Sequence, residues 1–292
     1  MELNYIVKEN DSYKTINQIL LSEFNLSTRL TTKLIKNKRI YKNGNIADTR
    51  DSIHNQDIII VDLNYEEDNS NIIPTKMNLK IIYEDEWFLV VDKPSGIAIH
   101  PSILHYDDSL SNGIRYYFDS IGLKKKIRPV NRLDFDTSGL VIFAKCEYIQ
   151  EQLSKQMLQG TFQKEYTCII EGVMNPKQGT IKLPIARKQG SIIERCIHTT
   201  GQNSITHYKT IQEFEDYSLV QCKLETGRTH QIRVHMKAMR HPIIGDTLYN
   251  KSSNLINRQA LHSSKIGCIH PITKKFLNLN SKLPDDMSSL LK

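Results

Sequence analysis

The sequence has no hydrophobic run long enough to cross a membrane. Its longest apolar stretches, at positions 139–144 and 88–91, fall far short of the ~20 residues that a spanning helix needs. The opening residues, Met-Glu-Leu-Asn-Tyr, also lack the basic and then apolar regions of a signal peptide. We therefore expect a cytoplasmic protein that has no membrane partner.

Cysteine is sparse, and its pattern argues against a disulfide framework. Five cysteines are scattered singly along the chain, at Cys146, Cys168, Cys196, Cys222 and Cys268. Their odd number and the lack of a Cys-x-x-Cys pair also argue against a zinc knuckle. We expect reduced thiols in the protein core.

Motifs for nucleotide, redox and zinc chemistry are missing. The chain has no Gly-rich phosphate loop followed by Lys and Ser or Thr, no dinucleotide fingerprint, no His-Glu-x-x-His and no Gly-x-Ser-x-Gly. His230 and His235 are five positions apart, a spacing that does not bring both onto one face of a helix. These absences weigh against nucleotide hydrolysis, nicotinamide chemistry and zinc proteolysis, and we expect neither a cofactor nor a metal.

The chain does have enough apolar residues for a core, and it has an excess of basic residues. Hydrophobic residues make up 39% of the 292 positions, which excludes wholesale disorder, and the length suggests two domains. The 39 Lys and Arg against 32 Asp and Glu give a net charge of +7. This excess fits a polyanionic partner such as a nucleic acid, although many enzymes with other partners carry as much.

Composition divides the chain into three segments. Residues 1–63 carry short helical and strand patterns, residues 64–78 are polar and contain Pro74, and residues 79–292 are dense in apolar runs. We expect a small domain, a linker and a main domain with these boundaries. No period of about 20–50 residues repeats, which argues against a solenoid.

Patterns in the first segment predict two helices followed by a hairpin. Apolar residues recur at helical spacing at Ile16, Ile19, Leu20 and Phe24. Ser27 is placed to cap a second helix, on which Leu30 and Leu34 face the core. The dipeptide Asn43-Gly44 then predicts a tight turn between strands, and residues 58–61 predict a closing strand.

Basic residues cluster on the second predicted helix and just after it. Six Lys or Arg and no acidic residue lie between positions 28 and 43. Arg29, Lys33 and Lys36 fall on one face of the helix, and Lys38 and Arg39 follow. The cluster is consistent with binding RNA phosphates, and equally with an ordinary solvated helix face.

The order helix, helix, hairpin, with a basic second helix, resembles the small RNA-binding module named after ribosomal protein S4. Two positions depart from that module. Asn37 stands where it usually has Gly, and Asn-Gln-Asp at 55–57 replaces its usual Gly-Asp. The resemblance implies that the basic cluster binds RNA, so that charge reversal at Arg29, Lys33 and Lys36 would weaken RNA binding.

The main domain is predicted to mix strands and helices. Strands are expected at 79–83, 87–91, 140–144 and 166–173, with one helix carrying Ile149, Leu153 and Met157 up to Gly160 and another beginning at Thr229. Strands in runs with helices between them indicate an α+β domain.

Two segments of the main domain are dense in charged residues. The first, at 128–139, directly precedes a buried apolar strand, so its charges must be solvated, paired or functional. A carboxylate there would be kept ionised by Arg132 and could serve as nucleophile or base, whereas for Asp136 we favour a role in capping the loop. The second, at 225–235, gathers cations around a helix start, which favours a phosphate or carboxylate site over a plain basic surface helix.

Six motifs follow one another through the main domain. They are Asp92-Lys-Pro-Ser-Gly96, Arg132-Leu-Asp-x-x-Thr-Ser-Gly139, Lys164-Glu-Tyr166, Gly227-Arg-Thr-His-Gln-Ile-Arg-Val-His235, His241-Pro-Ile-Ile-Gly-Asp246 and Leu261-His-Ser263. In this order, from about residue 79 to about residue 279, the chain resembles the RluA-type family of RNA pseudouridine synthases. Asn131 stands where the family usually has His, and we expect altered hydrogen bonding in the loop rather than lost activity.

This resemblance implies a fold and roles for four residues. The fold would be a mixed, mostly antiparallel β-sheet with flanking helices, preceded by the S4-like α/β module. Asp134 would be the catalytic aspartate, and Arg233 would pair with its carboxylate. Tyr166 would lie beneath the uracil, and Arg132 would help to hold the flipped-out nucleotide.

The implied reaction breaks the N1–C1′ bond of a uridine in RNA, turns the base and rejoins it through C5. No atoms are lost from the base and no electrons are exchanged, which agrees with the missing cofactor motifs. We expect a monomer that acts on 23S ribosomal RNA, with transfer RNA as the second choice. An RNA-binding or ribosome-assembly factor that keeps the fold without turnover is the alternative.

Overall fold

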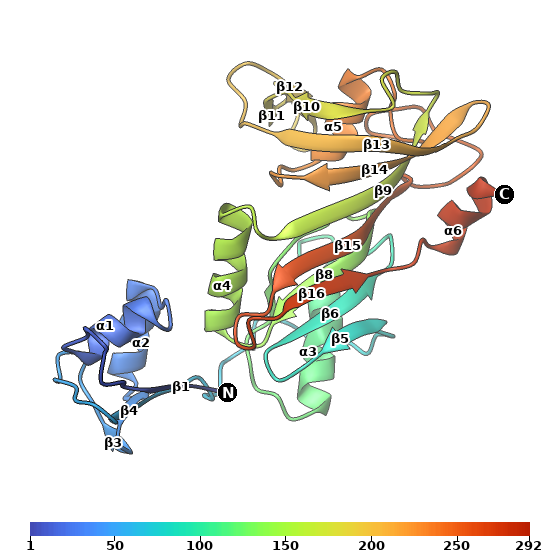
Figure 1. Cartoon of the computed structure of the whole chain (residues 1–292). Coiled ribbons are helices and arrows are strands. Elements are labelled where there is room, and N and C mark those ends of the chain that lie inside the picture. The colour runs from blue at the N-terminus through green and yellow to red at the C-terminus, as the bar shows by residue number, and fades with distance from the viewer.

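The chain folds around two main β-sheets, one small and one large, with a short two-stranded ribbon besides (Figure 1). The computed structural model describes all 292 residues. The small sheet lies within residues 1–63, drawn in blue in Figure 1, and the large sheet begins at residue 81. None of the helices combines the length and the apolar character needed to cross a membrane.

The small sheet has four antiparallel strands in the order β1-β4-β2-β3. The elements of this part are β1 (Glu2–Ile6), α1 (Ile16–Ser22), α2 (Thr28–Lys36), β2 (Ile40–Lys42), β3 (Asn45–Ile46) and β4 (Ile58–Asp62). Both predicted helices and the hairpin are confirmed, and Ser27 caps α2 by accepting a hydrogen bond from the backbone N of Leu30 at 3.2 Å. The sequence does not predict β1, because its pattern is too short to define a strand until it pairs with β4.

The large sheet has ten strands, eight of them in the order β10-β13-β14-β9-β15-β8-β6-β5, while β16 pairs with β15 and β7 with β8. Only β8 and β15 run parallel, so the predicted mixed, mostly antiparallel α+β fold is confirmed. Its elements are β5 (Ile81–Glu84), β6 (Phe88–Lys93), α3 (Leu110–Ser120), β7 (Arg128–Pro129), β8 (Ser138–Ala144), α4 (Glu147–Leu158), β9 (Gln163–Glu171), β10 (Gln178–Lys182), β13 (Ile205–Glu213), β14 (Tyr217–Leu224), α5 (Gln231–Ala238), β15 (Leu261–Ile269), β16 (Phe276–Asn280) and α6 (Asp285–Ser288).

Strand β8 reads as one continuous apolar run because both of its faces are covered. Val141 and Phe143 pack with Ile114 and Phe118 of α3 on one side of the sheet. The alternate residues of β8 belong to a second cluster that includes Ile149 and Leu153 of α4. Successive side chains of a strand point to opposite faces, so a strand between two helices needs apolar residues at every position.

A glycine fixes the point where the loop between β7 and β8 enters the sheet. Gly139 has φ +114°, and a Cβ at this position would lie 2.3 Å from the backbone O of Ser263 on the neighbouring β15. Any side chain would therefore push apart the parallel pair β8 and β15. This close approach anchors the C-terminal end of the loop that carries Asp134.

Helix α2 of the small domain is fastened to α4 of the main domain. Ser27 Oγ donates to Glu151 at 2.6 Å, while Arg29 Nη2 and Lys33 Nζ lie 2.5 and 2.7 Å from the two carboxylate oxygens of Glu147. Arg29 and Lys33, which the sequence predicts to bind RNA phosphate, are ion-paired within the chain, and their contact with RNA stays a prediction. Glu147 is more than a hundred positions away in the sequence, so nothing in the local pattern reveals this pairing.

Candidate active site

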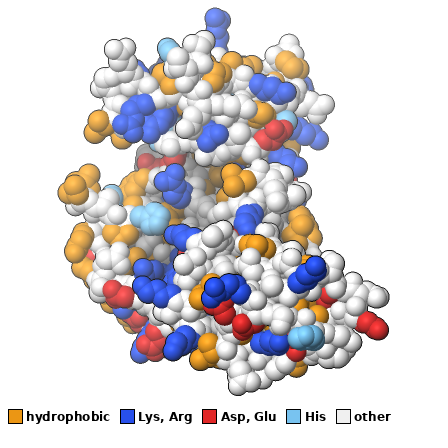
Figure 2. Space-filling model, turned by 90° about the vertical axis from the view of Figure 1, so that its left-hand side faces the viewer, with side chains coloured by type: hydrophobic (Ala, Val, Ile, Leu, Met, Phe, Trp, Pro, Cys, Tyr) orange, Lys and Arg blue, Asp and Glu red, His pale blue; other side chains and the backbone are white.

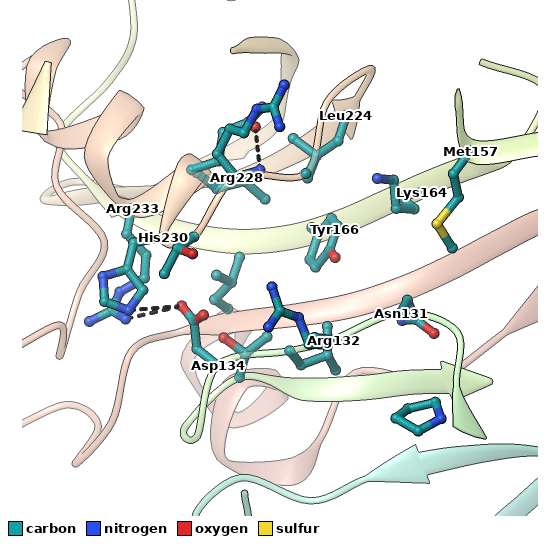
Figure 3. A pocket seen from close by; sticks show the side chains of 18 of the residues that line it. Asn131, Arg132, Asp134, Met157, Lys164, Tyr166, Leu224, Arg228, His230 and Arg233 are labelled. Atoms are coloured by element: carbon teal, nitrogen blue, oxygen red, sulfur yellow. Dashed lines mark hydrogen bonds and ion pairs between the residues drawn. The ribbon is translucent and has the colours of Figure 1, made fainter. Parts of the chain in front are cut away.

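A cavity of about 510 Å³ opens between the two halves of the main domain. Figure 2 shows the cleft between an upper and a lower lobe, with Lys and Arg side chains on both sides of its mouth. The lining comes from the loop between β7 and β8, the start of β9 and the loop before α5 (Figure 3). The four residues given roles by the family resemblance, Arg132, Asp134, Tyr166 and Arg233, all line this cavity.

Asp134 is accessible at the cavity wall and is held by an arginine. Its Oδ2 accepts a hydrogen bond from Nη1 of Arg233 at 3.0 Å, and its side chain is 25% exposed. Nε2 of His230 lies 3.8 Å from the same oxygen. The carboxylate is therefore oriented by a cation while one side remains open to a ligand (Figure 3).

Arg233 is itself fixed by a second carboxylate. Its Nε and Nη2 donate to the two oxygens of the buried Asp246 at 2.8 and 2.7 Å, which leaves Nη1 for Asp134. Burial alone would lower the pKa of Arg233, but hydrogen bonds and charge interactions with Asp246 and Asp134 raise it. The planar guanidinium is thus permanently charged and holds two carboxylates in fixed directions, because its donors point toward both of them.

Strand β9 presents Lys164 and Tyr166 to the cavity from the same face, because they are two positions apart. Burial, and then the charge of Asp134, raises the pKa of the Tyr166 phenol, so the hydroxyl stays protonated at neutral pH. Burial and the nearby Arg228 lower the pKa of Lys164, which has no carboxylate partner. The wall opposite Asp134 therefore offers an aromatic ring beside an unpaired amine.

Arg132 is exposed and points into the space between Asp134 and Tyr166 in Figure 3. It forms no ion pair within the chain, so its guanidinium is free to meet a ligand. The neighbouring Asn131 turns the other way. Its Nδ2 donates to the backbone O of Leu140 and its Oδ1 accepts from the backbone N of Ile142, both at 2.9 Å. Asn131 thus ties the loop to β8 while Arg132 remains at the cavity.

The start of α5 differs from the predicted one. The cap is His230, not Thr229, and His230 has a left-handed backbone with φ 57°. The reason is the side chain of Gln231, whose Oε1 accepts from the backbone N of Arg228 at 3.0 Å and from Thr226 Oγ1 at 2.8 Å. These two bonds close a turn over residues 226–231 and delay the helix by one residue.

Two residues of the site were not identified from the sequence as functional. Asp246 belongs to the His-Pro-Ile-Ile-Gly-Asp motif, and an acidic residue at the end of a family motif is the signal that could have found it. Tyr249 has no such signal. Its hydroxyl lies 2.8 Å from Nδ1 of His230, and the guanidinium of Arg233 lies 5.1 Å from its ring centroid.

No group of three or more His, Cys, Asp or Glu side chains in the chain is arranged to hold a metal ion. The five cysteines are unpaired, and four of them are buried.

Comparison with known proteins defines the class to which this fold and site belong. A family model described as RNA pseudouridylate synthase matches residues 87–238, just over half of the chain. The chain belongs to this family and is an RNA pseudouridine synthase, an isomerase.

Individual relatives cover most of the chain. It is 41% identical over 236 residues to the uncharacterised RNA pseudouridine synthase YhcT of Bacillus subtilis, covering 80% of this chain and 78% of that one. It is 35% identical over 289 residues to ribosomal large subunit pseudouridine synthase D of Zymomonas mobilis, covering 91% and 90%. Among solved structures, human RNA pseudouridylate synthase domain containing 1 matches with a TM-score of 0.59 at 26% identity, over 70% of this chain and 83% of that chain.

Proposed function

We propose that this protein converts specific uridines of large-subunit ribosomal RNA to pseudouridine, with Asp134 as the reacting group and without a cofactor. The single observation that carries the proposal is the placement of the Asp134 carboxylate. It is open to the cavity, bound to the buried Arg233 at 3.0 Å, and shares the cavity with Tyr166. The ribosomal target rests on relatives named ribosomal large subunit pseudouridine synthase D.

The chemistry fits the groups that are present. Isomerisation breaks the N1–C1′ bond and forms a C5–C1′ bond, so C5 loses a proton and N1 gains one while the base keeps its oxidation state. The carboxylate acts either by adding to the uracil ring or by taking a proton from the sugar. Both routes require Asp134 as a carboxylate, and Nη1 of Arg233 lies 3.0 Å from its Oδ2.

Tyr166 offers the base a flat surface. Its raised pKa keeps the phenol protonated, and the side chain lines the cavity that an extruded uracil would enter. Stacking on an aromatic ring contributes about 1–3 kcal/mol per base. This energy helps to offset the few kcal/mol that extrusion of a base from a folded RNA costs.

The proposal is tested with Asp134→Asn and the matched control Asp136→Asn. Asp136 lies two positions further along the same loop but does not line the cavity. Ribosomal RNA from a strain lacking the gene is incubated with each protein, and pseudouridine is scored by primer-extension stops after carbodiimide treatment. We expect Asp134→Asn to lower the rate by about 10³-fold or more while RNA affinity is retained. Asp136→Asn should remain within a few fold of the wild type.

Conversion by Asp134→Asn at the wild-type rate would refute the assignment of this carboxylate. Primer-extension stops on transfer RNA but not on ribosomal RNA would show that transfer RNA is the substrate. RNA binding by the wild-type protein without any stops would support the assembly-factor alternative instead.

A further inference from the structure

A second cavity adjoins the first on the side away from the small domain. It has a volume of about 280 Å³ and shares Arg228 and Thr229 with the active-site cavity. Its wall is the two-stranded ribbon of β11 (Ile185–Arg187) and β12 (Arg195–Ile197), which stands apart from the large sheet. Figure 1 shows this ribbon at the top of the molecule, beside α5.

Three arginines line this second cavity, and none of them forms an ion pair within the chain: Arg187, Arg195 and Arg228. Glu194, which directly precedes β12, is bound to Lys188 instead. The guanidinium of Arg228 donates only to the backbone O of Asn203, at 3.2 Å. The cavity therefore holds three cations without a counter-charge.

The register of the ribbon places two of these unpaired arginines opposite each other. Arg187 and Arg195 are direct cross-strand partners. Like charges placed directly opposite each other destabilise an antiparallel pair. An anion between the two guanidinium groups would remove this repulsion.

The ribbon is also held in a fixed position relative to the active site. The backbone N of Arg195 donates to the hydroxyl of Tyr249 at 2.7 Å, and that hydroxyl lies 2.8 Å from Nδ1 of His230. His230 in turn lies beside Asp134. A group bound between the arginines would thus be placed at a set position relative to the reacting carboxylate.

We propose that Arg187, Arg195 and Arg228 bind one backbone phosphodiester of the RNA, next to the uridine that enters the active site. This inference rests on the proposed function. A phosphodiester fits because guanidinium groups bind phosphate oxygens in pairs, and because any nucleotide in the first cavity is covalently followed by phosphates on both sides. Clamping one of them holds the backbone in the turned-out path that a flipped nucleotide requires, so the site positions the substrate and takes no part in the chemistry.

The test compares two double variants that remove the same charge. Arg187→Ala with Arg195→Ala removes the proposed site. Lys182→Ala with Lys209→Ala is the control, because these exposed lysines of β10 and β13 line neither cavity and form no ion pair. The first measurement is the affinity of a labelled ribosomal RNA hairpin, carrying a mapped target uridine, across a range of salt concentrations.

We expect the arginine variant to bind about 10-fold more weakly, with a log–log salt slope that is shallower by about 0.7–0.9, the value for one phosphate contact. The loss in turnover should appear mainly in KM. The control should keep the wild-type slope. The melting temperature of the arginine variant should not fall, because its substitutions relieve a repulsion, whereas a purely structural role would lower it.

A second arm identifies the ligand as an RNA phosphate. Hairpins with one neutral methylphosphonate linkage at each position around the target uridine are bound to both proteins. At one position the neutral linkage should weaken wild-type binding by the same factor as the arginine substitutions, and it should not weaken the arginine variant further. Additive effects at every position, or equal salt slopes for the two double variants, would overturn the proposal.

The failure of this inference can be told apart from failure of the proposed function. If the wild type forms pseudouridine and the two double variants behave alike, the phosphate site is wrong and the function stands. If no pseudouridine forms but the arginine variant alone loses affinity and slope, the function is wrong and the anion site stands. Loss of binding to an acidic peptide, but not to RNA, would assign the site to a protein partner and refute the proposal.

Discussion

The basic residues of the small domain and those of the cleft differ in what they face. In the small domain, Arg29 and Lys33 pair with Glu147, and Arg39 pairs with Asp62. In the cleft, Arg132 and the three arginines around the second cavity form no ion pair within the chain. Positive charge that is already neutralised stabilises the chain, whereas unpaired charge beside a cavity is available to a polyanion. The comparison shows that the clustering of basic residues along the sequence does not tell ion-paired residues from residues that are free to bind a polyanion.

The paired basic residues of the small domain also join the two domains. The ion pairs of α2 with α4 hold the small domain against the main domain. Lys36 and Lys38 are exposed and form no ion pair, and RNA binding by the basic cluster stays a prediction.

The largest effect on stability is expected where a charge pair is buried. Asp246→Asn would leave Arg233 without its main counter-charge in a site where both side chains are almost fully covered, at 8% and 1% exposure. We expect a loss of about 3 kcal/mol in the free energy of unfolding, measured by urea denaturation. The matched change at the domain contact, Glu147→Gln, should cost less than about 1 kcal/mol, because its partners Arg29 and Lys33 are 83% and 38% exposed. Equal losses of unfolding free energy for the two variants would contradict the difference between the buried pair and the exposed domain contact.

A second prediction concerns RNA affinity. Arg132→Ala should weaken binding of a ribosomal RNA hairpin by about 10-fold, because it removes an unpaired cation from the cavity. Arg29→Ala removes a cation that is bound to Glu147 and should change the affinity by less than about 2-fold. Fluorescence anisotropy at one fixed salt concentration measures both. A larger loss for Arg29→Ala would support the prediction that this residue binds RNA.

The smallest effect is expected in the dependence of stability on pH. Burial lowers the pKa of His235 and of His262 in the main domain. The unfolded chain therefore binds more protons than the folded one as the pH falls below the ordinary histidine pKa of about 6.5. Stability should decrease from pH 7 downwards until the lowered folded pKa is passed.

Urea denaturation at pH 7 and pH 5.5 checks this direction. His235→Gln should reduce the loss of unfolding free energy between pH 7 and pH 5.5. The substitution removes a titrating group that is fully buried between Thr206 and Leu183. The control is His54→Gln in the small domain, an exposed histidine, which should leave the change as it is. A flatter curve for the control alone would show that the acid sensitivity belongs to the small domain.

Much of the fold could be predicted because its signals are local. The apolar run at 140–144 and the helical spacing of Ile149, Leu153 and Met157 predict β8 and α4, and both are present. Strand β1 and the ribbon of β11 and β12 escape prediction, because such short strands are defined by pairing with distant residues rather than by their own pattern.

The candidate site also has parts that the sequence predicts and parts that it does not. Family motifs predict the residues that share the cavity, including Asp134 and Tyr166, and the structure brings them together. Pairwise partners are not predictable from one sequence. Asp246 as the anchor of Arg233, and Glu147 as the partner of Lys33, become visible only when elements far apart in the chain are folded against each other.

The central claim is that the open carboxylate of Asp134 makes this chain a working pseudouridine synthase on ribosomal RNA. It is tested most directly by mapping pseudouridine at nucleotide resolution in cells with the wild-type gene, without the gene, and with only the Asp134→Asn allele. We predict a small set of large-subunit positions that carry pseudouridine in the first strain and uridine in the other two. Retention of these pseudouridines in the Asp134→Asn strain, together with their loss in the deletion, would contradict the account.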